Sequence, residues 1–224
     1  MSKVHNFSAG PGILPLDVLK QASDACINFD NMNLSLLEIS HRSKNYVAVM
    51  DEARALIKEL FEVGDDYEVM YLGGGASTQF AMVPYNLLTD SGYAAYVNTG
   101  VWASKAIKEA KIIGNTKVIA SSEDKNFTYI PKGYEVPKDA DYLHITSNNT
   151  IYGTQMKSFP KSDIPVVCDM SSDLFSRKVN AKDFSLIYAG AQKNMGPAGT
   201  TLVVVKEEIL GKNGRVIPSM LDYA

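Results

Sequence analysis

Short apolar segments of strand length alternate with segments of helical period from residue 68 onward, and this alternation leaves few possible folds. Strands separated by helices form a mainly parallel sheet with helices on both faces. We therefore predict an α/β domain whose ligands bind at the carboxyl ends of the strands. The expected strands are 68–72, 94–98, 117–121, 142–146, 166–169 and 185–189, and the expected helices are 77–88 and 101–111.

The remaining predicted elements flank this alternating region. Pro15 is expected to open a first helix, and apolar residues at helical spacing predict a second helix over 43–61. A last strand, 201–205, follows a connection too short for a helical crossover, so it is predicted to be antiparallel. A further helix is expected to start at 206–210.

Charge and hydropathy exclude several classes of partner. The net charge is −3 and the chain has no run of lysines or arginines, which argues against nucleic acid and anionic membranes. No apolar segment is long enough to span a bilayer, and the N-terminus lacks the apolar core of a signal peptide. Cys26 and Cys168 fit no metal-binding or redox spacing, so both are expected to be packed, reduced thiols of a cytoplasmic protein.

Lys193 is the strongest candidate for a catalytic residue. It lies among small residues, in AGAQKNMGPAG, between two apolar strands, so that backbone and ligand can approach it closely. Burial disfavours the ammonium form of a lysine, and the neutral amine attacks carbonyl groups. The segment therefore predicts a lysine that forms a Schiff base. The alternative is a surface lysine in a glycine-rich turn.

Three weaker signals precede this lysine along the chain. The turn Gly73–Ser77 offers backbone N–H groups to a phosphate, Trp102 can stack on a flat ring, and Asp169 can pair with a pyridinium nitrogen. Taken alone, they are also typical of a tight turn, a core aromatic residue and a helix cap. In this order, with Gln192 as a further phosphate donor, they indicate a site for pyridoxal 5'-phosphate (PLP).

Eight sequence motifs carry a more specific resemblance. They are, in order, NFSAGPGILP, EISHRSK, YLGGGASTQF, NTGVWASKA, SNNTIYGT, CDMSSD, AGAQKNMGPAG and IPSMLDY. Together they cover the length of the chain, which resembles the phosphoserine aminotransferases among the class-V aminotransferases. The resemblance implies an aspartate-aminotransferase-like fold (fold type I), with a seven-stranded, mainly parallel sheet that contains one antiparallel strand.

The resemblance also implies the roles of the cofactor-binding residues. Lys193 would carry PLP as a Schiff base and move a proton between substrate and cofactor. Asp169 would hold the pyridinium nitrogen, Trp102 would stack on the ring, and Thr150 would lie near the ring oxygen. The cofactor phosphate would be held by three residues, Ala76, Ser77 and Gln192.

Three further residues, Ser8, His41 and Arg42, would bind the substrate according to the resemblance. The planar guanidinium group of Arg42 suits a carboxylate. Some relatives have an arginine at the position of Ser77 that helps to hold the phosphate of the substrate. In this chain, that contact is expected to come from another residue.

The implied reaction is reversible amino transfer between glutamate and 3-phosphohydroxypyruvate, giving phosphoserine and 2-oxoglutarate. It belongs to serine biosynthesis, and bacterial relatives also act on the four-carbon analogue used for vitamin B6 (pyridoxine). The implied partners are glutamate, a phosphorylated 2-oxo acid and a second subunit in a homodimer.

The resemblance divides the chain into two parts. Residues 1–14 are expected to join the small domain, and 15–224 to form most of the PLP-binding large domain, with the small C-terminal domain absent after Ala224. One alternative is a truncated, inactive fragment of that enzyme. A cysteine desulfurase is another, but it needs a cysteine on a mobile loop, whereas Cys26 is expected in a helix and Cys168 in a strand. A nucleotide-binding Rossmann protein would need a glycine fingerprint that the chain lacks.

Overall fold

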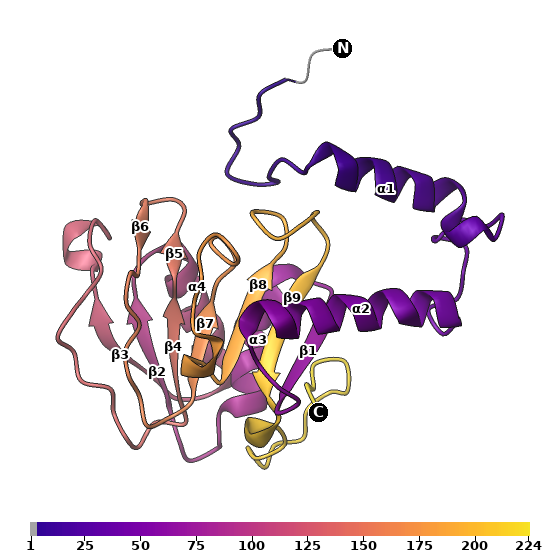
Figure 1. Ribbon diagram of the computed structural model, residues 1–224. Coiled ribbons are helices and arrows are strands. Elements are labelled where there is room, and N and C mark those ends of the chain that lie inside the picture. Colours follow the sequence, from indigo (N-terminus) through magenta and orange to yellow (C-terminus); the bar gives the residue numbers. More distant parts are fainter. Residues whose placement is uncertain (1–3) are drawn as a thin grey trace.

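A seven-stranded sheet forms the centre of the computed structural model, which describes residues 4–224 (Figure 1). In spatial order its strands are β1 (Tyr67–Leu72), β9 (Thr201–Lys206), β8 (Leu186–Gly190), β7 (Val166–Asp169), β4 (Tyr142–Thr146), β2 (Ala94–Asn98) and β3 (Thr116–Ser121). Within this sheet only β9 is antiparallel to its neighbours, β1 and β8. The predicted strands and the direction of the last one are confirmed.

Helices cover both faces of the sheet, as predicted. Helix α2 (Lys44–Phe61) packs on one face through Ile57 and Phe61. Helices α3 (Gly75–Leu87) and α4 (Val101–Ile113) pack on the other face through residues such as Phe80 and Ile107. Successive side chains of a strand point to opposite faces, so a central strand such as β2 contributes to both cores. Strand β2 is buried along its whole length for this reason.

The turn from β1 into α3 has a backbone that only glycine fits. Gly74 has a φ of +86°, and a Cβ there would lie 2.1 Å from the hydroxyl oxygen of Thr78. That hydroxyl instead donates a hydrogen bond to the carbonyl oxygen of Gly74, at 2.9 Å. The turn therefore fixes where the N-terminus of α3 lies relative to the carboxyl end of β1.

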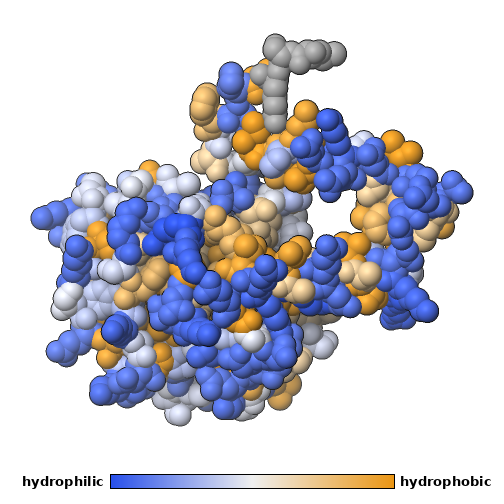
Figure 2. Space-filling model, in the orientation of Figure 1, coloured by the Kyte–Doolittle hydropathy of each residue, from blue (hydrophilic) through white to orange (hydrophobic). Residues whose placement is uncertain are grey.

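The N-terminal helix α1 (Leu16–Ile27) forms as predicted, but it lies apart from the sheet and buries none of its residues (Figure 1). Its apolar side chains, among them Leu16 and Val18, are exposed, and Figure 2 shows apolar residues along α1 and α2. The expectation for Cys26 was therefore wrong, since this thiol is exposed on α1, whereas Cys168 is buried as expected.

In the described part of the chain, the elements outside the sheet and the α-helices are short. They are β5 (Asn148–Asn149), β6 (Thr154–Gln155) and the single 3-10 turns η1 (Phe29–Asn31), η2 (Glu123–Lys125), η3 (Ala181–Asp183) and η4 (Glu207–Ile209). The helix predicted from residue 206 was wrong in type, because only the turn η4 forms there. In residues 4–224 we find no helix with the length and apolar character needed to cross a membrane.

Candidate active site

The carboxyl ends of β7 and β8 and the N-termini of α3 and α4 surround a cavity of about 160 Å³. Its lining consists of Gly75, Ala76, Ser77, Phe80, Trp102, Asp169, Ser171, Ser172, Gln192 and Lys193. The structure thus brings together all the predicted cofactor residues except Thr150, which touches the cavity only through its contact with Lys193. Parallel strands explain the convergence, since their carboxyl ends meet at one edge of the sheet.

Lys193 lies in the loop after β8 and is partly buried. Its Nζ donates a hydrogen bond to the Thr150 hydroxyl at 2.5 Å and lies 5.4 Å from the centre of the Trp102 ring. Burial lowers the pKa of Lys193, and the carboxylate of Asp169 opposes this by favouring the ammonium. The amine is therefore easier to deprotonate than that of an exposed lysine.

Thr150 is held by a hairpin that the sequence patterns did not predict. Strands β5 and β6 pair antiparallel, and the side-chain amide of Asn149 donates a hydrogen bond to the Thr154 hydroxyl at 3.1 Å. Thr150 lies in the turn between these strands. The strands have only two residues each, which is too short for a period to be recognised.

Asp169 ends β7 and is only 4% exposed. Both the backbone N–H and the hydroxyl of Ser171 donate hydrogen bonds to its Oδ1, at 2.9 and 2.6 Å. Burial raises the pKa of Asp169, while the Ser171 hydrogen bonds and the nearby Lys193 lower it. Sequence reasoning did not single out Ser171 or its neighbour Ser172, although the CDMSSD motif contains both.

The N-terminus of α3 forms the opposite wall of the cavity. The first backbone N–H groups of an α-helix have no intrahelical partner, and here they include those of Ala76 and Ser77. Within residues 4–224 no side chain caps this helix, so these groups are free for a ligand. A Cβ built on Gly75 would meet nothing within 4 Å, so the space beside it is open. Free N–H groups and the positive end of the helix dipole favour an anion at this place.

Comparison with known proteins identifies the family. A sequence profile described as aminotransferase class-V matches residues 4–219. The chain belongs to the class-V aminotransferases. It is 66% identical to the phosphoserine aminotransferase of Flavobacterium johnsoniae and 60% identical to that of Parabacteroides distasonis, and each match covers 99% of this chain. The chain spans 63% and 62% of the lengths of these two relatives.

Solved structures confirm fold type I. A phosphoserine aminotransferase from Bacillus circulans subsp. alkalophilus is 47% identical with a TM-score of 0.93, over 97% of this chain and 61% of that one. The PLP-bound phosphoserine aminotransferase of Trichomonas vaginalis is 30% identical with a TM-score of 0.91, over 99% of this chain and 63% of that one.

The cavity of this class-V aminotransferase fits the chemical groups of PLP. The N-terminus of α3 suits the phosphate, and Lys193 offers an amine for the aldehyde. Asp169 Oδ2 takes part in no hydrogen bond within residues 4–224, which leaves it for the ring nitrogen. The Trp102 indole offers a flat apolar surface, and its Nε1 is buried without a partner in the described part of the chain.

The predicted substrate residues are not in contact with this cavity. Ser8, His41 and Arg42 are exposed, and no hydrogen bond or ion pair within residues 4–224 joins their side chains to its lining. Their role in binding substrate stays a prediction.

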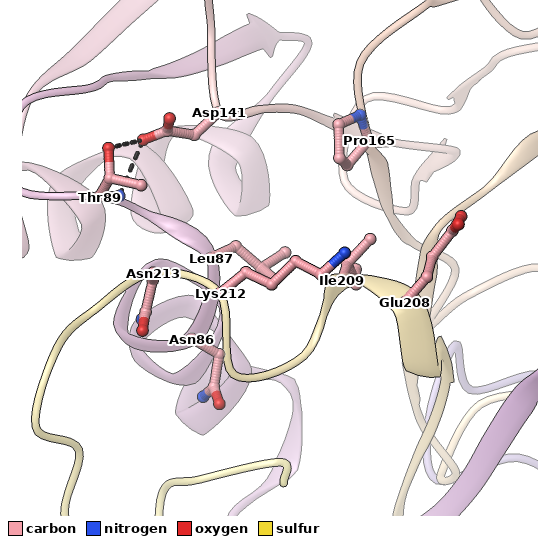
Figure 3. A pocket seen from close by; sticks show the side chains of 9 residues that line it. All are labelled: Asn86, Leu87, Thr89, Asp141, Pro165, Glu208, Ile209, Lys212 and Asn213. Carbon is pink, nitrogen blue, oxygen red and sulfur yellow. Dashed lines mark hydrogen bonds between the residues drawn. The ribbon is translucent and has the colours of Figure 1, made fainter.

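A larger hollow, of about 350 Å³, lies at the other edge of the sheet (Figure 3). Asp141 and Pro165 line it, and they directly precede β4 and β7, so this is the edge with the amino ends of the strands. The Asp141 carboxylate already accepts two hydrogen bonds, from the backbone N–H and the hydroxyl of Thr89 (Figure 3). The position of this hollow makes it a poor candidate for the active site, since sheets of this type bind ligands at the carboxyl ends of their strands.

The N-terminal segment crosses the loop that carries Lys193. The backbone N–H of Gly12 donates a hydrogen bond to the carbonyl oxygen of Gln192 at 2.7 Å. A Cβ on Gly12 would lie 2.2 Å from the carbonyl oxygen of Lys193, and a Cβ on Gly10 would lie 3.1 Å from the Lys193 side chain. The segment therefore lies against the lysine loop only because these positions are glycine.

Gly12→Ala is expected to detach residues 4–14 from the lysine loop, because the new methyl group would meet backbone that has no room to move. Losing one hydrogen bond of ordinary strength should speed amide hydrogen exchange in this segment about tenfold. Gly73→Ala is the matched control, since a Cβ there meets nothing within 4 Å. Unchanged exchange in Gly12→Ala would contradict the contact.

Proposed function

We propose that this chain binds PLP covalently through Lys193 and acts as the PLP-binding part of a phosphoserine aminotransferase. The whole enzyme would transfer an amino group reversibly between glutamate and 3-phosphohydroxypyruvate, as a homodimer in the cytoplasm. The observation that carries the proposal is the cavity, which collects an amine, a buried carboxylate, an indole and a free helix N-terminus. The names of the relatives that are 60–66% identical support the choice of substrate.

Bound PLP supplies a pyridine ring that accepts electrons from the amino-acid Cα. Asp169 would keep the ring nitrogen protonated, and its burial would strengthen this interaction because little water competes. The backbone N–H groups of Ala76 and Ser77, with Gln192, would hold the phosphate. The indole of Trp102 would pack against the ring and exclude water from it.

Lys193 moves the proton in this scheme. Burial lowers the pKa of its amine, so the neutral form that accepts a proton is easier to reach than in an exposed lysine. The Thr150 hydroxyl accepts a hydrogen bond from Nζ and so holds the amine beside the Trp102 ring while it is not bonded to the cofactor.

The alternative of a cysteine desulfurase has little support in the structure. Cys168 is fully buried in β7, and burial raises the pKa of its thiol well above the ordinary value. A reactive thiol needs the opposite, namely exposure and a lowered pKa. Cys26 is exposed but lies on α1, outside the lining of the cavity.

The proposal is tested by incubating the chain with PLP, reducing with borohydride, and mapping the adduct by mass spectrometry. We expect one adduct, on Lys193, and none in Lys193→Arg. Lys105 provides the control, since its Nζ lies 4.7 Å from the centre of the Trp102 ring but Lys105 does not line the cavity. Lys105→Arg should keep the adduct. Labelling scattered over surface lysines would contradict the proposal.

Adding phosphoserine to the loaded chain separates the remaining alternatives. Release of 2-oxo product and conversion of PLP to its amino form would show amino transfer by this chain. An adduct on Lys193 without amino transfer would instead indicate a part of the enzyme that binds cofactor but is inactive by itself.

A further inference from the structure

Ser171 connects β7, which ends at the acid, with β8, which precedes the lysine loop. Its hydroxyl donates a hydrogen bond to Asp169 Oδ1 at 2.6 Å and accepts one from the backbone N–H of Gly190 at 3.1 Å. Asp169 is the last residue of β7, and Gly190 is the last residue of β8, three residues before Lys193. The side chain of Ser171 thus links the end of β7 to the end of β8.

The hydroxyl of Ser171 donates to Asp169, because an ionised carboxylate only accepts hydrogen bonds. The N–H group of Gly190 approaches a lone pair of the same oxygen. Together with the backbone N–H of Ser171, this hydroxyl places two donors on Oδ1 and none on Oδ2. Since Asp169 lines the cavity, Oδ2 is the oxygen left for a ligand.

We propose that Ser171 is a positioning residue for Asp169: its hydroxyl donates to one carboxylate oxygen and leaves the other directed to the cavity. This role of Ser171 rests on the proposed function, in which Asp169 meets a protonated ring nitrogen. Ser171 acts through Asp169 in this role.

The charge of Asp169 depends on several groups around it. Burial raises its pKa, and the nearby Asp173 raises it further. The hydrogen bonds from Ser171 and the charge of Lys193 lower the pKa, and Tyr188 of β8 and Cys168 of β7 are neutral at ordinary pH because burial raises the pKa of each. Ser171 is therefore the main neutral donor that offsets the burial of this carboxyl group.

The test is a direct titration of Asp169 by carbon NMR in the chain labelled at aspartate, without PLP. Asp169→Asn identifies the resonance by its absence. A hydrogen bond to a charged group has the strength to move a pKa by about one to two units, so Ser171→Ala should raise the midpoint by that amount. Ser171→Thr, which keeps a hydroxyl, should restore it to within about half a unit of the wild-type value.

Ser172→Ala is the matched control. Ser172 lines the same cavity, but its hydroxyl donates to the carbonyl oxygen of Asn148 and accepts from the side-chain amide of the same residue, at 3.0 and 2.8 Å. Its loss should leave the Asp169 midpoint unchanged. A midpoint in Ser171→Ala equal to the wild-type value would overturn the inference, even if the melting temperature fell, because a purely structural role changes only stability.

The two proposals fail separately. The titration requires no cofactor, so it decides the role of Ser171 even if PLP does not bind. Absence of a PLP adduct on Lys193 would count against the proposed function only.

Discussion

Asp169→Asn is expected to weaken PLP binding by about 10²–10³-fold, because it leaves a protonated ring nitrogen in a buried site without its counter-charge. Breaking such a pair costs about 3–5 kcal/mol, and each 1.4 kcal/mol is a factor of ten in affinity. The carboxylate is 4% exposed, so water does little to replace it. Equilibrium dialysis of the chain against PLP measures the change.

The same substitution should also change how the rate of PLP adduct formation depends on pH. This second effect would show that the weaker binding results from the lost charge of Asp169. The Asp169 carboxylate favours the ammonium form of Lys193, so its removal should lower the pKa of this amine further. The pH at which half of the amine reacts should then shift downward, although binding becomes weaker. Stopped-flow measurement of adduct formation across pH would show the shift.

Asp173→Asn is the control for losing a buried acid. Asp173 is 7% exposed, ion-pairs with Arg177 and lies outside the cavity lining. We expect a loss of stability from this variant, with PLP affinity changed far less than in Asp169→Asn. Equal affinities for Asp169→Asn and the unchanged chain would contradict the assignment of the ring nitrogen to Asp169.

The centre of the sheet could be predicted closely because its strands are buried on both faces. Strand β2, for example, has no exposed residue, so it appears in the sequence as a short apolar segment that ends at Asn98. The five-residue segment 206–210 is too short for such a distinction. A single 3-10 turn and the first turn of a helix have the same pattern over this length.

The apolar pattern of α1 predicted a helix correctly but could not say what covers it. Periodicity identifies the residues that share a face, such as Leu16 and Leu19, whereas burial depends on segments far away in the sequence. The expectation that Cys26 is packed was wrong for this reason.

The centre of the site was more predictable than its surroundings. Lys193, Asp169 and Trp102 follow or end strands, and parallel strands bring such positions to one edge without any knowledge of the loops. The role of Thr150 was predicted only from the family resemblance, since its position depends on a hairpin whose strands have two residues each. Ser171 was missed because a serine after a strand-ending aspartate is most simply a turn residue.

His144 is expected to make the fold sensitive to acid. It lies in β4, is 1% exposed, and stacks on Tyr96 with ring centres 4.8 Å apart. Its Nε2 shares a hydrogen bond with the Tyr188 hydroxyl at 2.8 Å, while Nδ1 is buried with no partner in residues 4–224. Burial lowers the pKa of His144 from 6.5 to about 3. The imidazole therefore stays neutral in the folded protein where an unfolded chain would protonate it.

The direction of the pH effect follows from this difference in pKa. Between pH 6.5 and about 3 the unfolded chain binds a proton that the folded chain does not. The stability that His144 contributes is therefore full above pH 6.5 and falls by about 1.4 kcal/mol per pH unit below it, up to about 5 kcal/mol. Asp169 acts in the opposite sense, because its raised pKa gives stability that is present below pH 3.8 and lost as the pH rises.

Urea unfolding at pH 7, 6, 5 and 4 measures the effect, with His144→Gln as the variant. Glutamine keeps a polar group for Tyr188 but does not protonate, so the variant should lose less stability than the unchanged chain as the pH falls. The exposed His41 provides the control, since His41→Gln should follow the unchanged chain. Parallel curves for the unchanged chain and His144→Gln would mean that other groups cause the acid sensitivity. That outcome would mean that His144 protonates in the folded protein as readily as in the unfolded chain, which requires water to reach the unpartnered Nδ1.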